Sequence, residues 1–156
     1  MQEAALEATA THKDLILFSA TGSGKTLAFL LPLVEQLRQN PTNTTAIIIV
    51  PSRELAIQIE TVFKSLQLNL KVTCCYGGHK REIEENNLIQ APALLIGTPG
   101  RLADHIRREN IKTATIKTLV LDEFDKSLEL GFQEEMSFII GSVSYTHLTL
   151  PTNREV

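Results

Sequence analysis

Cysteines, long apolar runs and basic charge are all scarce in this sequence, and each shortage excludes a class of protein. The 156 residues include two cysteines, adjacent at positions 74 and 75, whereas a disulfide scaffold or a zinc cluster needs more cysteines at suitable spacings. The longest nearly apolar run covers residues 27–34, far short of the about 20 residues of a membrane-spanning helix. The first residues lack the basic and apolar regions of a secretory signal. We therefore expect a protein of a reducing, cytoplasmic compartment that makes no contact with a membrane.

The charge balance is mildly acidic, with a formal net charge of -3 and a pI near 5.8. A domain that binds nucleic acid through a broad basic surface often has a pI above about 9. The phenylalanines fall mostly in apolar runs and are typical of core positions rather than of a platform for stacked bases. Any contact with nucleic acid would therefore depend on a few local residues.

The length and composition fit one globular domain, since 43% of the residues are hydrophobic and 21% are charged. Short apolar runs alternate with longer amphipathic stretches. Strands are predicted at residues 15–18, 46–50, 70–76, 93–96 and 118–121, and helices at about 25–39, 53–66, 81–89 and 134–140; a turn at residues 98–100 leads into a further helix that ends at residue 106. Continuous Ile, Val and Leu runs are typical of strands that are buried on both faces. The pattern predicts an α/β fold of three layers with a mainly parallel central sheet.

The most specific motif lies between the first predicted strand and the first predicted helix. Residues 19–26 match the phosphate-binding loop pattern, except that Ser19 stands where the first glycine is expected. Glycines let backbone N–H groups surround phosphate oxygens at the start of a helix, where the dipole favours anions. Lys25 would reach the β- and γ-phosphates, and the Thr26 hydroxyl would bind Mg²⁺. The predicted nucleotide-binding residues here are Thr21, Gly22, Ser23, Gly24, Lys25 and Thr26; the alternative is a flexible Gly/Ser turn.

Two adjacent carboxylates follow the fifth predicted strand. Parallel strands present their carboxyl ends to the crevice where ligands bind, so Asp122 and Glu123 are expected there. Asp122 would hold Mg²⁺, and Glu123 would orient or deprotonate the attacking water. Together with the loop they predict a nucleoside triphosphatase. Its catalytic residues would be Lys25, Asp122 and Glu123, and its magnesium ligands Thr26 and Asp122.

Four further elements, in the family's order, resemble those of the DEAD-box RNA helicases. Residues 122–125 read Asp-Glu-Phe-Asp, similar to the family's Asp-Glu-Ala-Asp, and residues 51–56 read Pro-Ser-Arg-Glu-Leu-Ala, similar to its Pro-Thr-Arg-Glu-Leu-Ala. Residues 77–78 match its double glycine, and residues 98–101 match its Thr-Pro-Gly-Arg element. The resemblance covers about residues 1–140.

This resemblance implies the N-terminal RecA-like domain of an ATP-dependent RNA helicase, a P-loop NTPase that uses ATP and Mg²⁺. It places Gln2 at the family's adenine-reading glutamine, and an amide does offer the donor and acceptor that suit adenine. Turn residues would contact the RNA backbone without reading bases, because glycines permit close approach. These residues are Pro51, Ser52, Arg53, Gly77, Gly78, Thr98, Pro99, Gly100 and Arg101. The alternatives are an exposed helix residue at Gln2 and ordinary turn chemistry at the glycines.

The sequence also departs from the family pattern. Phe124 replaces the alanine of the tetrad, which adds bulk beside the two predicted catalytic acids. The family's Ser-Ala-Thr coupling element is not found where it is expected, since the chain reads Pro-Thr-Asn at residues 151–153. We expect a helicase ATP-binding domain over residues 1–141, truncated at both ends, and a disordered or foreign tail over residues 142–156.

The expected function is that of a helicase fragment which binds Mg-ATP and the RNA backbone. In the full-length protein ATP hydrolysis would be coupled to RNA duplex unwinding, with a C-terminal RecA-like domain as the missing partner that supplies arginine fingers. The isolated chain is expected to be inactive or weakly active. Two alternatives stay open: a catalytically inactive module that binds nucleotide or RNA, and another two-domain nucleic-acid translocase.

Overall fold

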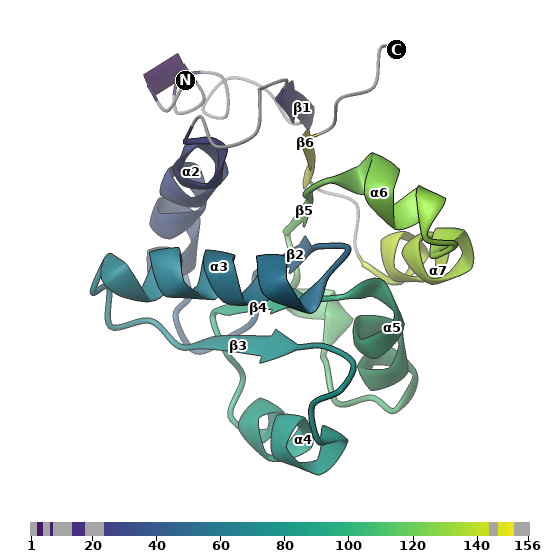
Figure 1. The fold of residues 1–156 in the computed structure, drawn as a ribbon. Helices are drawn as coiled ribbons and strands as arrows, with labels where there is room; N and C mark the ends of the chain where they lie inside the picture. The colour runs from purple at the N-terminus through teal and green to yellow at the C-terminus, as the bar shows by residue number, and fades with distance from the viewer. Residues whose placement is uncertain (1–2, 5–6, 8–13, 18–23, 144–146, 152–156) are drawn as a thin grey trace.

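Six parallel strands form the central sheet of the computed structural model (Figure 1). The structure describes residues 3–4, 7, 14–17, 24–143 and 147–151. The strands are β1 (Asp14–Leu17), β2 (Ala46–Ile49), β3 (Val72–Cys75), β4 (Leu94–Gly97), β5 (Thr118–Leu121) and β6 (His147–Pro151). Their order across the sheet is β1-β6-β5-β2-β4-β3, and every neighbouring pair is parallel.

Helices connect the strands and cover both faces of the sheet, which makes the three layers that the sequence predicts. They are α2 (Lys25–Gln39), α3 (Arg53–Ser65), α4 (Arg81–Ile89), α5 (Pro99–Arg107), α6 (Phe124–Glu129) and α7 (Gln133–Ser142), with a 3₁₀ turn at Thr113–Thr115. Figure 1 shows α2 and α3 on one side of the sheet and α5 and α7 on the other. Within the described residues, no helix has both the length and the apolar character that crossing a bilayer requires.

Two apolar clusters hold the layers together, and β2 shows how one strand serves both. Ile47 and Ile49 belong to the cluster that includes residues of α5 and α7, whereas Ile48 belongs to the cluster that includes residues of α2 and α3. All three side chains are buried, and burying such a side chain contributes about 1.5–3 kcal/mol. Successive residues of a strand point to opposite faces. A strand covered on both sides must therefore be apolar at every position.

Besides the short 3₁₀ turn, one helix and one strand of the described structure were not predicted. Helix α6 is a short helix that begins directly after Glu123, so its six residues offer little periodicity. Strand β6 lies between β1 and β5 and pairs with both. The predicted disorder of residues 142–156 is therefore wrong for residues 147–151, because the backbone of this segment completes the hydrogen bonding of two strand edges. The foreign origin of the tail stays a prediction.

Replacing Gly97, the last residue of β4, tests how tightly the sheet packs against α5. A Cβ atom at this position would lie 2.5 Å from the Cys75 carbonyl oxygen and 2.7 Å from Leu102 Cγ. We expect Gly97→Ala to lower the free energy of unfolding by about 1–3 kcal/mol through overpacking, as measured by urea denaturation. The matched control is Gly141→Ala, because that position has open space and lies within α7. There alanine should be neutral or stabilising by up to about 1 kcal/mol, and equal destabilisation of the two variants would contradict the expectation.

Candidate nucleotide and RNA site

The predicted functional elements follow the carboxyl ends of neighbouring strands, and backbone hydrogen bonds join them there. The Thr98 amide, which follows β4, donates to the Cys75 carbonyl of β3 at 3.0 Å. The Asp122 amide, which follows β5, donates to the Ile49 carbonyl of β2 at 3.0 Å. The sheet therefore brings together the starts of motifs that lie far apart in sequence.

Lys25 and Asp122 form an ion pair at this edge. Lys25 is the first residue of α2, and its Nζ lies 3.1 Å from Asp122 Oδ1. Gly24 caps the helix in the left-handed conformation, at φ 80°, which glycine adopts without steric cost. The end of the predicted phosphate loop therefore faces the predicted metal ligand. Gln2, Thr21, Gly22 and Ser23 lie outside the residues that the structure describes.

The environment of Asp122 suits a cation. The residue is 2% exposed, and its burial raises the pKa of the carboxyl. Lys25 opposes this shift, whereas the charge of Glu123 adds to it. Oδ1 accepts no well-aligned hydrogen bond from the described part of the chain, so its only close partner there is the Lys25 ammonium. Carboxylate oxygens are the ligands that Mg²⁺ prefers. This buried, under-satisfied oxygen fits a magnesium ligand.

Glu123 adopts an uncommon backbone conformation directly after Asp122. Its φ of 51° and ψ of 47° lie in the left-handed region, which costs a residue other than glycine about 1–2 kcal/mol. The turn sends the chain into α6, and the Glu123 carboxylate pairs with Lys126 Nζ at 3.3 Å. The side chain remains about one quarter exposed. Unlike Asp122, it can meet a water molecule.

Arg53 links two of the predicted RNA-binding elements. Ser52 caps α3 by accepting a hydrogen bond from the Leu55 amide on its Oγ at 3.3 Å, which fixes the turn that precedes Arg53. The Arg53 guanidinium lies over the Tyr76 ring, 5.3 Å from its centroid. Its NH1 is 3.8 Å from the position of a Cβ at Gly78. The 51–53 turn and the double-glycine turn are therefore neighbours.

The double-glycine turn and the Thr-Pro-Gly-Arg turn present open backbone. Gly78 is in the left-handed region with a φ of 83°, and Gly77 has no atom within 4 Å of a possible Cβ among the described residues. Pro99 is the first residue of α5, where its missing N–H leaves no helical hydrogen bond unmade. At Gly100 the nearest atom to a possible Cβ is a Phe132 ring carbon at 3.9 Å. A polymer backbone could approach both turns closely.

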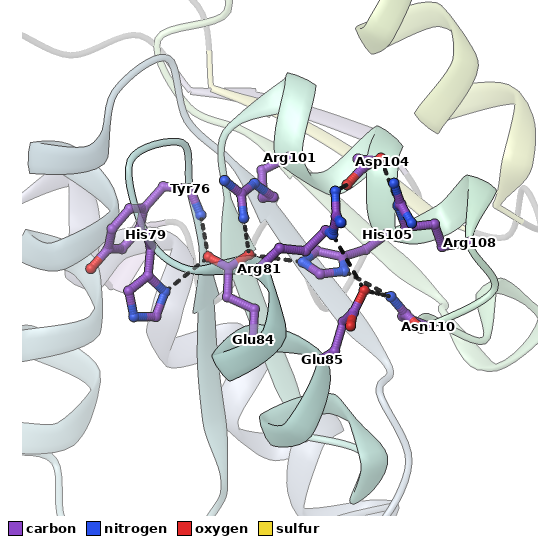
Figure 2. A network of polar contacts seen from close by, with 10 residues as sticks. All are labelled: Tyr76, His79, Arg81, Glu84, Glu85, Arg101, Asp104, His105, Arg108 and Asn110. Carbon is purple, nitrogen blue, oxygen red and sulfur yellow. Dashed lines mark hydrogen bonds and ion pairs between the residues drawn. The ribbon is translucent and has the colours of Figure 1, made fainter.

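A buried carboxylate lies between these two turns (Figure 2). Glu84, in the first half of α4, is fully buried. Its Oε2 accepts hydrogen bonds from the Tyr76 amide at 3.0 Å and from His79 Nδ1 at 3.1 Å. Its Oε1 accepts from Arg101 NH1 at 3.1 Å and from His105 Nε2 at 2.8 Å. One oxygen thus serves each turn.

Charge and hydrogen bonding keep this carboxylate ionised. Burial alone would raise the pKa of Glu84, but the bonds from His105, the Tyr76 amide and His79, with the charge of Arg101, hold the pKa below its ordinary value. Asn110 Nδ2 lies 3.1 Å from His105 Nδ1. An amide can only donate there, so His105 carries its proton on Nε2 and donates it to Glu84. All four groups around Glu84 are therefore donors.

The same carboxylate is close to a cysteine, which raises the question of a metal. Ligand atoms of Cys75, Glu84 and His105 all lie within 4.8 Å of one another. However, the Arg101 guanidinium donates to the oxygen that a cation would need. Burial, and then the Glu84 charge, raises the pKa of the Cys75 thiol, which keeps it protonated. The geometry favours a hydrogen-bonded cluster over a metal centre.

Sequence reasoning missed this cluster, although one spacing signal was present. Glu84 lies in a polar helix, and His79 and His105 belong to none of the predicted functional motifs. Yet Arg101 and His105 are four residues apart on α5, so they share one face of that helix. The structure also gives Arg101 a partner within the protein, because NH1 of its guanidinium lies 3.1 Å from Glu84 Oε1 (Figure 2). The contact of Arg101 with RNA stays a prediction.

Comparison with known protein families identifies the family of this chain. The family described as DEAD/DEAH box helicase matches residues 1–156 of this chain. The chain belongs to this family. The resemblance predicted from its motifs is confirmed.

Individual relatives agree with that assignment. The DEAD-box ATP-dependent RNA helicase CshA of Bacillus licheniformis is 43% identical over 141 residues, which cover 89% of this chain and 29% of that protein. The ATP-dependent RNA helicase HAS1 of Chaetomium globosum is 46% identical over 134 residues, which cover 82% of this chain and 23% of that protein. A crystal structure of a DEAD box protein from the hyperthermophile Methanococcus jannaschii superimposes with a TM-score of 0.87 at 30% identity, over 97% of this chain and 44% of that one. The chain spans less than a third of the length of these two curated relatives.

Within this family the sequence departs at Phe124, and the structure shows where the added bulk goes. The ring is partly buried and packs against the apolar cluster that contains Ile49 and Leu121. The side chain thus contributes to the core beneath the two acids.

The pKa of Glu84 predicts how stability depends on pH. A carboxyl whose pKa is lower in the folded state stabilises the protein above the unfolded pKa of about 4.3, and this contribution is lost as the pH falls through the folded pKa. We therefore expect Glu84→Gln to reduce the free energy of unfolding at pH 7, with the difference from wild type shrinking as the pH falls below the unfolded pKa of about 4.3. Urea denaturation at several pH values measures it. Glu82→Gln on the exposed side of α4 is the control, and a difference for Glu84→Gln that stays constant with pH would contradict the expectation.

Proposed function

We propose that this chain is the N-terminal, ATP-binding RecA-like domain of an ATP-dependent RNA helicase. The observation that carries the proposal is the 3.1 Å pair between Lys25 and Asp122 at the carboxyl edge of the sheet. It brings the phosphate-loop lysine against the buried carboxylate of the family's acidic motif. Their charges are complementary to the phosphates of a nucleotide and to the cation that accompanies them.

The residues at the carboxyl ends of the strands would have different roles in nucleotide hydrolysis. Lys25 would leave Asp122 to bind the β- and γ-phosphates, with the loop amides, and Gln2 would read adenine. Thr26 and Asp122 would hold Mg²⁺, which supplies positive charge to the phosphate oxygens when bound. Glu123, the more exposed acid, would orient and deprotonate the attacking water. This assignment makes Lys25, Asp122 and Glu123 the catalytic residues.

RNA would bind through its backbone at the neighbouring turns. Arg53 supplies positive charge, while the open amides at Gly77, Gly78 and Gly100 can donate to phosphate oxygens. Ser52, Thr98 and Pro99 shape the turns, and Pro51 begins the first of them. No base-reading group is required. The proposal therefore predicts binding that depends little on RNA sequence.

Unwinding belongs to a longer protein in this proposal. The chain covers 29% of the CshA helicase and 23% of the HAS1 helicase, which leaves room for a second RecA-like domain in such proteins. Arginine fingers supplied by another unit accelerate phosphoryl transfer by about 10³–10⁵. The chain alone should therefore hydrolyse ATP slowly and unwind no duplex. We also propose that the protein is located in the cytoplasm.

Replacing Lys25 tests the phosphate site. We expect Lys25→Ala to weaken Mg-ATP binding at least tenfold, because the variant loses the ammonium that pairs with the phosphates; isothermal titration calorimetry measures it. The control is Lys64→Ala, which removes an exposed lysine of α3 that pairs with Glu60. An ATP affinity equal in Lys25→Ala and wild type, with both folded by circular dichroism, would overturn the phosphate-loop assignment.

Replacing Glu123 separates an enzyme from an inactive binding module. We expect Glu123→Gln to retain ATP affinity within about threefold and to lower the hydrolysis rate by 10²-fold or more, since general bases contribute about 10²–10⁴. Single-turnover hydrolysis of radiolabelled ATP at excess chain measures the slow reaction. Asp125→Asn, in the same tetrad, controls for the loss of one acidic charge. Wild type with no hydrolysis above the buffer rate would instead favour the inactive module.

A further inference from the structure

We infer that Glu84 is a positioning residue that joins the double-glycine turn and the Thr-Pro-Gly-Arg turn into one RNA-binding unit. The inference rests on the proposed function, because it assigns a role in RNA binding to a side chain that would not touch RNA. It depends on how the hydrogen-bond donors are distributed between the two carboxylate oxygens. Oε2 takes its donors from one turn, and Oε1 takes its donors from the other.

Besides the contact of Arg53 with the Tyr76 ring, the double-glycine turn is held by hydrogen bonds to Glu84. In the range 24–143 that the structure describes, the amides of Gly77 and Gly78 donate no hydrogen bond to the protein, which leaves them open to a ligand. The turn is instead held at its flanks, by the Tyr76 amide and the His79 ring, and both donate to Glu84 Oε2. The orientation of the free amides therefore follows the position of one carboxylate.

The second turn depends on the other oxygen. Arg101 ends the Thr-Pro-Gly-Arg element, and His105 lies one helical turn later; both donate to Oε1. The Asn110 amide donates a hydrogen bond to Nδ1, the other nitrogen of the His105 ring. Because α5 begins at Pro99, the position of the helix sets the position of the Thr98–Gly100 backbone. A movement of Glu84 would thus reach both turns.

A carboxylate is the only common side-chain group that can serve four donors in this way. It accepts on both oxygens, whereas an amide of the same size accepts on one and donates on the other. Glu84→Gln would therefore place an NH₂ group against the donors of one turn. Because the side chain must move away from those donors, its hydrogen bonds to the other turn would weaken as well. The ionisable groups that contact Glu84 are Arg101 and the two histidines. Arg81 pairs instead with Glu85 and Asp104 (Figure 2).

The test compares RNA and ATP affinities of the same variants of this chain. The RNA probe is a fluorescein-labelled single-stranded oligouridylate, read by fluorescence anisotropy, and ATP binding is read by calorimetry. We expect Glu84→Gln to weaken RNA binding roughly tenfold and to change ATP affinity less than twofold. A general loss of stability would weaken both. Glu82→Gln, an exposed glutamate of the same helix, is the matched control and should match wild type in both measurements.

Measurements of backbone dynamics provide a second test that needs no RNA. We expect ¹⁵N order parameters of Gly77, Gly78 and Gly100 to fall from about 0.85 toward the about 0.6 of flexible backbone in Glu84→Gln. Faster hydrogen exchange at the Tyr76 amide should accompany the change, because that amide donates to Glu84. Loosening confined to one turn, or to neither, would overturn the inference.

The outcomes separate this inference from the proposed function. Wild type that fails to bind the oligouridylate contradicts the proposed RNA binding, and the order parameters then decide the role of Glu84. Wild type that binds, with Glu84→Gln binding equally well, overturns the inference alone. Should Glu84→Gln fail to fold, Arg101→Gln replaces it. That variant removes one Oε1 donor and, by the inference, must lower the order parameters of Gly77 and Gly78 in the other turn.

Discussion

The parallel register of the sheet is the constraint on which the site depends. Parallel pairing of β3, β4, β2 and β5 brings their carboxyl ends to one edge, and backbone hydrogen bonds extend the pairing one residue further, to Thr98 and Asp122. Each motif begins where its strand ends, so four segments separated by up to about seventy residues become neighbours. Their chemistry would be unrelated in a fold without this register.

Two buried carboxylates at this edge have pKa values that are shifted in opposite directions. Glu84 is surrounded by four donors, which keep its pKa below the ordinary value and make it a fixed structural charge. Asp122 has one ammonium nearby and an under-satisfied oxygen, so its burial raises its pKa. A satisfied charge holds a structure in place, whereas an unsatisfied one favours a ligand that brings positive charge. The contrast separates the proposed positioning residue from the proposed metal ligand.

The fold was largely predictable because its signals are local. The Ile and Val run of β2 and the Gly-Lys-Thr start of α2 each specify their own element through burial, turn chemistry and helix capping. Strand β6 and helix α6 were not predictable in this way. The strand is stabilised by pairing with β1 and β5, and the short helix follows a left-handed turn at Glu123 that no propensity favours.

The sequence by itself determined the family, the α/β fold and the residue types of the proposed nucleotide site, since motif spacing and apolar periodicity are properties of the chain alone. Only the tertiary structure decided which side chains meet: that Lys25 pairs with Asp122, that Phe124 packs into the core, and that Arg101 donates to a buried glutamate. The physical reason is that these contacts join separate elements. Whether a carboxylate such as Glu84 lies among donors or in water depends on the packing of α4 against β3 and α5, which no local pattern encodes.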